Sequence, residues 1–208
     1  GFRMVGGKNV VSVLHLLLHA SFVLAPQQQH IAGQADLAAI APSEVGGIGL
    51  QTQELGTISG TIGVIGLTVG GILGGFLIAK DGLKAWIWWM AAAINLPNVA
   101  YLYLAVAQPE SLWTIGAAVC VEMFGYGLGF AAYLVYMMYV AQGEHATSHY
   151  AICTGFMAAG IMIPGMSSGG LQEQVGYQAF FVWILLATIP SFVVTALIPL
   201  DAEYGKRE

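Results

Sequence analysis

A single acidic residue is the strongest candidate for chemistry in this sequence. Glu122 lies inside a long apolar stretch, about 15 Å from its start at 1.5 Å per residue. A carboxylate is costly at membrane depth, so such a residue usually faces the bundle interior and has a function. Desolvation favours the neutral acid, so Glu122 could bind and release a proton, as proton-coupled transport requires. The alternative is a permanently protonated side chain that donates a hydrogen bond between helices.

Three tyrosines share the predicted helical face of Glu122. Tyr126, Tyr133 and Tyr136 follow it at helical spacing. Each offers a flat apolar ring with a polar tip, which suits a sugar or a peptide as the bound solute. The alternative for these rings is ordinary core packing. We therefore expect a solute path along this face, or a packed aromatic stripe.

Two asparagines form a second polar group at membrane depth. Asn95 and Asn98 flank Pro97 in the preceding apolar stretch. A proline at this depth frees backbone groups and can kink a helix when neighbours or water satisfy those groups. The pattern predicts that the asparagines line a cavity, although such kinks also occur in static bundles.

Patterns typical of metal sites and enzymes are incomplete. His15/His19 and His145/His149 have the spacing of two metal ligands on one helix, but no third ligand is well placed. Residues 165–169 match G-x-S-x-G formally, yet no histidine follows that could serve as the base. We therefore expect no metal, no cofactor and no enzymatic activity.

The composition indicates an integral membrane protein. Of 208 residues, 57% are hydrophobic and 8% charged, against about 25% charged in soluble domains. The mean hydropathy is +0.75. Stretches of roughly 20 apolar residues can span a membrane. Five are clear, at 55–79, 85–107, 112–141, 150–170 and 179–200, and a weaker one lies at 10–25. A further apolar patch, 31–42, is expected to be a loop or an interfacial helix.

The basic residues predict an orientation. With six spans, all six Lys and Arg residues fall on one side: Arg3, Lys8, Lys80, Lys84, Lys206 and Arg207. The positive-inside rule makes that side cytoplasmic, so both termini are expected inside. The net charge of −5, without a basic patch, argues against nucleic acid as a partner. The absence of a start methionine, with the six-span count, suggests a segment of a longer protein.

Glycine recurs every three or four residues in the 55–79 stretch. This spacing makes a small-residue stripe, against which another helix can pack closely in lipid. The stripe fits static packing or a sliding surface in a protein that changes shape. Its members are Gly56, Gly60, Gly63, Gly66, Gly70 and Gly74.

From Ser43 to the end, the sequence resembles AmpG-type permeases of the major facilitator superfamily. EVGGIGLQTQELGTISGTIGVIGLTVGGILGG is similar to the family's eighth helix with its lead-in, and VEMFGYGLGFAAYLVYMMYV to the tenth. HYAICTGFMAAGIMIPGMSSGGLQEQVGYQAFFVWILLATIPSFVVTAL resembles the eleventh and twelfth helices. GFLIAKDGLK is similar to the cytoplasmic loop motif of the superfamily, through Lys80, Asp81, Gly82 and Lys84.

The resemblance implies the C-terminal six of twelve helices, built as two inverted three-helix repeats. Such a permease imports muropeptides, which are cell-wall sugar–peptide fragments, across the bacterial inner membrane by proton symport. Its partners would be the solute, protons, the lipid bilayer, and an N-terminal six-helix half or a second copy. Glu122 becomes a candidate proton or substrate site. Residues 1–42 depart from the family's seventh helix, so the alternative is a non-transporting membrane module or a relic of a truncated permease.

Overall fold

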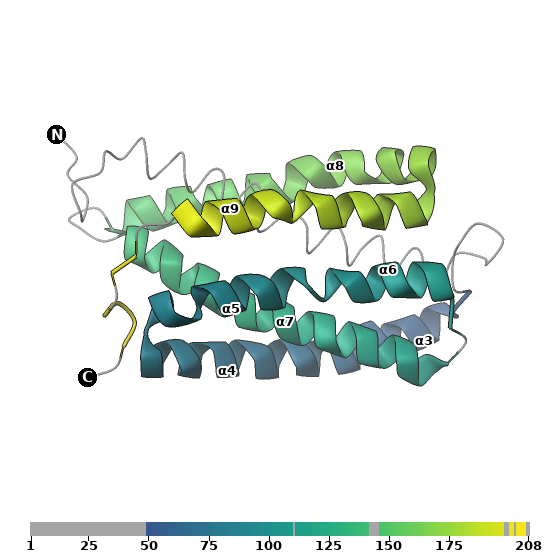
Figure 1. The fold of residues 1–208 in the computed structure, drawn as a ribbon, viewed down its shortest axis with the longest axis horizontal. Coiled ribbons are helices and arrows are strands. Elements are labelled where there is room, and N and C mark those ends of the chain that lie inside the picture. Colours follow the sequence, from purple (N-terminus) through teal and green to yellow (C-terminus); the bar gives the residue numbers. More distant parts are fainter. Residues whose placement is uncertain (1–48, 110, 142–145, 198–199, 202, 207–208) are drawn as a thin grey trace.

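The computed structural model describes residues 49–109, 111–141, 146–197, 200–201 and 203–206, and every regular element in these ranges is helical. The elements are α3 (Thr52–Thr57), η2 (Ile58–Gly63), α4 (Val64–Asp81), α5 (Leu83–Asn95), α6 (Asn98–Ala107), α7 (Leu112–Val140), α8 (Ala146–Ala187) and α9 (Ile189–Leu197). Figure 1 shows these helices running along the long axis of the molecule. The predicted span 10–25 and the apolar patch 31–42 lie outside the described residues.

Three helices in the described ranges are long and apolar enough to cross a membrane. They are Thr52–Asp81, Leu83–Ala107 and Leu112–Val140. Their bounds lie within a few residues of the predicted stretches 55–79, 85–107 and 112–141, so these predictions are confirmed. Hydropathy locates them well because each one is bounded by polar residues or a turn.

The fourth apolar stretch lies in the long helix α8, and the fifth is divided between the end of α8 and α9. Gly176 interrupts it with a φ of 77° and a ψ of 165°, a backbone conformation that favours glycine. We call 146–175 the first arm and 177–187 the second arm. Figure 1 shows the chain turning at one end of the molecule and returning through the second arm and α9. The predicted stretches 150–170 and 179–200 leave a gap at 171–178 that is too wide, because helix continues on both sides of Gly176.

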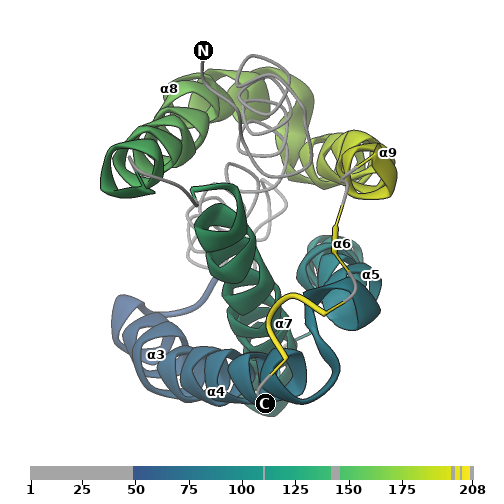
Figure 2. The same ribbon diagram turned by 90° about the vertical axis from the view of Figure 1, so that its left-hand side faces the viewer.

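Helix α7 lies in the middle of the bundle, between α4 and α5 on one side and α8 on the other (Figure 2). The glycine stripe of α4 packs directly on the backbone of α7. A Cβ atom at Gly66 would lie 2.8 Å from the Cys120 carbonyl oxygen, and one at Gly74 would lie 2.9 Å from that of Leu128. Gly70 faces the Phe124 carbonyl oxygen even more closely. The predicted close approach of a second helix is confirmed here.

The same stripe is open at its other end. A Cβ atom at Gly56 or Gly60 would meet nothing within 4 Å. These two glycines are therefore not packing positions among the described residues. The close approach begins near Gly63, where a Cβ atom would lie 3.3 Å from the Met123 side chain.

Helix α5 approaches another side of α7 through glycines of α7 itself. A Cβ atom at Gly129 would lie 2.7 Å from Cβ of Ile94 and 2.9 Å from the Met90 carbonyl oxygen. Gly125 faces the Ala93 carbonyl oxygen and the Pro97 ring. Helices α4, α5 and α7 thus form a closely packed unit, which we call the α4–α5–α7 unit.

The end of the chain packs against the turn between α4 and α5. The Tyr204 carbonyl accepts a hydrogen bond of 2.9 Å from the N–H of Leu83, the first residue of α5. The Tyr204 ring meets that of Tyr139 edge-on, with centroids 4.6 Å apart. This contact satisfies one of the backbone donors that a helix start leaves unpaired.

We predict that Gly70→Ala destabilises the fold and that Gly75→Ala does not. The added methyl group at residue 70 meets the α7 backbone, which cannot move aside, whereas residue 75 faces open space. Overpacking of this kind costs about 1–3 kcal/mol. Thermal unfolding of the purified variants in detergent measures the difference. Equal stability of the two variants would show that α4 and α7 are not packed this closely.

Candidate functional site

The site begins with a break in the second membrane-spanning helix. Pro97 has no N–H to donate to the Ala93 carbonyl, so the regular hydrogen-bond ladder is interrupted. Beyond the proline the backbone hydrogen bonds span three residues instead of four. They run from Val99 N–H to the Leu96 carbonyl at 3.0 Å and from Ala100 N–H to the Pro97 carbonyl at 2.8 Å. This break separates α5 from α6 at membrane depth.

Glu122 is fully buried, with 0% of its surface exposed. It lies about 15 Å from the start of α7, at 1.5 Å per residue. Its Oε2 accepts a hydrogen bond of 3.0 Å from the Tyr101 hydroxyl of α6, and Tyr101 is 5% exposed. The carboxyl group therefore faces the bundle interior, as the cost of placing it against lipid predicts.

The site lies between two apolar clusters. The cluster nearer the α4–α5 turn includes Leu83, Met90 and Met137, and the cluster toward the other end includes Ile115, Val119 and Phe181. Along α7, Glu122 lies between the residues that belong to one cluster and the residues that belong to the other. Hydrogen bonds are electrostatically stronger in such low-dielectric surroundings, and an unpaired polar group is more costly there.

The two asparagines beside the break differ in their contacts. Asn95 is 5% exposed, and its Nδ2 donates a hydrogen bond of 2.7 Å to the Ala91 carbonyl one turn earlier. Asn98 is 1% exposed, and neither its Nδ2 nor its Oδ1 has a hydrogen-bond partner among the described residues. Asn98 lies one turn before Tyr101 on α6. Its amide keeps the capacity to bind a polar group, on the same helix as Tyr101.

The predicted tyrosine face spreads along the length of α7. Tyr126 lies one turn after Glu122 on α7, and its side chain is half-buried. Tyr133 and Tyr136 are buried in the cluster near the α4–α5 turn, about 16 and 21 Å further along α7. The structure therefore brings Glu122, Tyr126, Tyr101 and the break together, and it leaves Tyr133 and Tyr136 at another depth.

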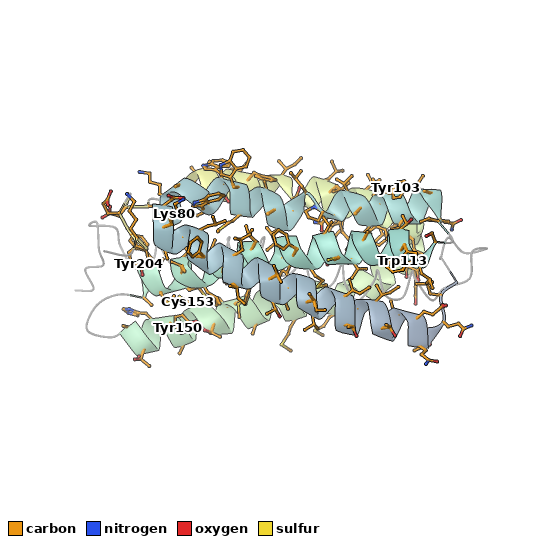
Figure 3. All side chains as sticks on the ribbon, turned by 90° about the horizontal axis from the view of Figure 1, so that it is seen from below. Lys80, Tyr103, Trp113, Tyr150, Cys153 and Tyr204 are labelled. Atoms are coloured by element: carbon orange, nitrogen blue, oxygen red, sulfur yellow. The ribbon has the colours of Figure 1, made fainter. Side chains whose placement is uncertain are left out.

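The loop motif lies at one end of the molecule, away from Glu122. Gly82 turns the chain with a φ of 90°, and the Trp86 indole N–H donates a hydrogen bond of 2.8 Å to the Asp81 carboxylate. Lys80 and Lys84 are exposed on either side. Figure 3 shows Lys80 at the same end as Tyr204, with Tyr103 and Trp113 at the opposite end.

Sequence reasoning missed Tyr101. It lies among apolar residues of the second span, where a single tyrosine resembles a packing residue. A weak signal was present, because Tyr101 follows Asn98 by three residues and so lies near it on a helix. For metal binding, no group of three or more His, Cys, Asp or Glu residues gathers in the described ranges. His15, His19 and His145 lie outside those ranges.

Comparison with known proteins finds permeases and transporters. The chain is 23% identical over 160 residues to the anhydromuropeptide permease of Escherichia coli strain K12. The aligned region covers 77% of this chain and 32% of that protein. It is 28% identical over 144 residues to the putative transporter AmpG 1 of Rickettsia bellii, and the aligned region covers 68% of this chain and 34% of that protein. It is 24% identical over 162 residues to the putative transporter AmpG 4 of Rickettsia felis, and the aligned region covers 78% of this chain and 39% of that protein. No protein-family model matches the chain.

These matches support the family likeness of the motifs. The chain spans about a third of the length of the curated relatives it matches, and most of its own length is covered. Its long apolar helices and these relatives indicate an integral membrane protein. The chain is similar to AmpG-type permeases over most of its length, and the match is consistent with the C-terminal half of such a protein.

Proposed function

We propose that the chain is the C-terminal half of a proton-coupled transporter that imports cell-wall muropeptides or related solutes. The observation that carries this proposal is the fully buried Glu122 carboxyl, paired with Tyr101 next to a broken helix. The curated relatives named as an anhydromuropeptide permease and as putative transporters supply the solute class. The chain would form six membrane helices in two inverted three-helix repeats.

The chemistry of the site fits reversible protonation. A buried carboxyl group can bind a proton to become neutral, which lowers the cost of holding it in apolar surroundings. Asn98 could then bind an amide or a hydroxyl of the solute, because both its donor and its acceptor lack partners in the described part of the chain. Tyr126, half-buried on the same face as Glu122, would supply a ring for packing against a sugar.

One half of such a transporter encloses one side of a solute path. In secondary transporters the site lies near the middle of the membrane, and the halves rock about it to give alternating access. The other side would come from an N-terminal six-helix half or from a second copy of this chain. We place the assembly in the bacterial inner membrane.

The orientation follows from the exposed basic residues. Lys80, Lys84 and Lys206 lie at the same end of the described structure, because the end of the chain packs on the α4–α5 turn. The positive-inside rule makes this end cytoplasmic. Both termini are then cytoplasmic if the chain crosses the membrane six times.

The second candidate is a membrane module that does not transport. The chain spans about a third of the relatives' length, and residues before Ser43 depart from the family pattern. Such a module would share the fold of the described helices and would lack uptake.

We predict that Glu122→Gln reduces uptake of labelled anhydromuropeptide at least tenfold in vesicles that contain the chain with its N-terminal half. Glutamine keeps the size of the side chain and cannot exchange a proton. Glu173→Gln, at an exposed carboxylate, is the matched control and should transport normally. Full uptake by Glu122→Gln would remove the proposed proton site. Absence of uptake by the unaltered chain in this assembly would favour the non-transporting module.

We also predict that a cysteine at residue 84 is labelled only from the cytoplasmic side, and one at residue 111 only from outside. Gly82 is unsuitable for this test because it is buried and has a positive φ, whereas Lys84 and Ser111 are exposed at opposite ends. A membrane-impermeant maleimide applied to intact and to opened cells gives the measurement. The unaltered chain corrects for Cys120 and Cys153. Labelling of residue 84 in intact cells would reverse the orientation.

A further inference from the structure

The hydrogen bond between Tyr101 and Glu122 connects two groups of packed helices. Helix α7 is held in the α4–α5–α7 unit by backbone contacts at glycines such as Gly70 and Gly129. Helix α6 is separated from α5 by the break at Pro97 and packs chiefly against α8. The bond from Tyr101 of α6 to Glu122 of α7 therefore joins α6 to the unit.

Tyr101 also connects α6 to the second arm of α8. Its ring stacks on Phe181, with centroids 6.1 Å apart and planes inclined by 22°. Phe181 is 2% exposed, and Gln178 of the same arm donates a hydrogen bond of 3.4 Å to the Ala105 carbonyl of α6. The ring of Tyr101 is thus fixed by α8, while its hydroxyl reaches the carboxyl group of α7.

We propose that Tyr101 is a positioning residue that holds the Glu122 carboxyl group and links it, through Phe181, to the second arm of α8. This inference rests on the proposed role of Glu122. A hydrogen bond to an ionised carboxylate is roughly twice as strong as one between neutral groups. Protonation of Glu122 therefore weakens the tie between α6 and α7 and leaves the contact of Tyr101 with Phe181 intact.

The helices around Glu122 add few other ionisable groups. Helix α7 itself carries Tyr126 and Cys120 near this depth, and Tyr177 begins the second arm of α8. Helices α4 and α5 carry ionisable side chains only at the turn between them. The Tyr101 hydroxyl donates to the Glu122 carboxyl from α6, so the strength of this bond can follow the proton on Glu122.

A purely structural tyrosine would behave differently. Tyr101 belongs to the apolar cluster that includes Leu104, Ile115 and Phe180, where a phenylalanine would fill the same volume. The substitution Tyr101→Phe therefore removes the hydroxyl and keeps the packing. Any change that it causes at Glu122 reports on the hydrogen bond.

Infrared difference spectroscopy of the chain in lipid nanodiscs tests the proposal. Glu122→Gln identifies the carboxyl band, whether the group is protonated or ionised. We expect Tyr101→Phe to shift this band, to higher frequency for the protonated C=O, because the hydroxyl no longer donates to it. Tyr103→Phe is the control, because Tyr103 lies on the same helix and is 54% exposed. An unshifted band in Tyr101→Phe would overturn the positioning role.

The link to α8 is tested by changing Phe181. Phe181→Ala removes the ring on which Tyr101 stacks, and Phe181→Leu keeps an apolar side chain if the alanine variant does not fold. We expect the folded variants to shift or broaden the Glu122 band, because Tyr101 loses its support. A band identical to that of the unaltered chain would overturn the link. These readouts require no transport, so they stand apart from the uptake assay, in which failure would concern the proposed function alone.

Discussion

The close packing of helices on the backbone of α7 is the constraint on which the rest of the structure depends. Gly66, Gly70 and Gly74 let α4 contact the α7 carbonyls, and Gly125 and Gly129 let α5 do the same from another side. In lipid, where apolar burial between helices gains little, such contacts drive helix association. They fix α7 as the central helix and set the depth at which Glu122 is buried.

Because α7 is held in place by its neighbours, the interruption of the helix between α5 and α6 matters for the site. Pro97 separates α6 from α5, so α6 can keep its contacts with α8 while α5 remains packed on α7. The polar groups of the site gather at this junction, with Tyr101 and Asn98 on one side and Glu122 on the other. A carboxyl group at a junction between packed bodies can respond to a proton by changing how those bodies are held together.

Sequence patterns predicted what depends on hydropathy and helical spacing. The three described helices that are long and apolar enough to cross a membrane lie within a few residues of the predicted spans, and the packing of Gly70 was expected from its stripe. Helical spacing gave the shared face of Tyr133 and Glu122 but not their separation in depth, which follows from the rise along α7. The contact between Tyr101 and Glu122 depends on how two helices pack, and no local pattern encodes it. The gap between the predicted stretches 150–170 and 179–200 is wider than the turn itself, because a single residue with positive φ, Gly176, reverses the chain between helical segments.

Proton movement driven by the solute tests proton coupling at Glu122. Vesicles that contain the chain with its N-terminal half, and no imposed gradient, are given unlabelled anhydromuropeptide while the external pH is recorded. If Glu122 carries the coupled proton, the medium becomes alkaline as protons enter with the solute, and Glu122→Gln abolishes this change. Solute entry without alkalinisation, or an equal pH change in Glu122→Gln, would contradict it.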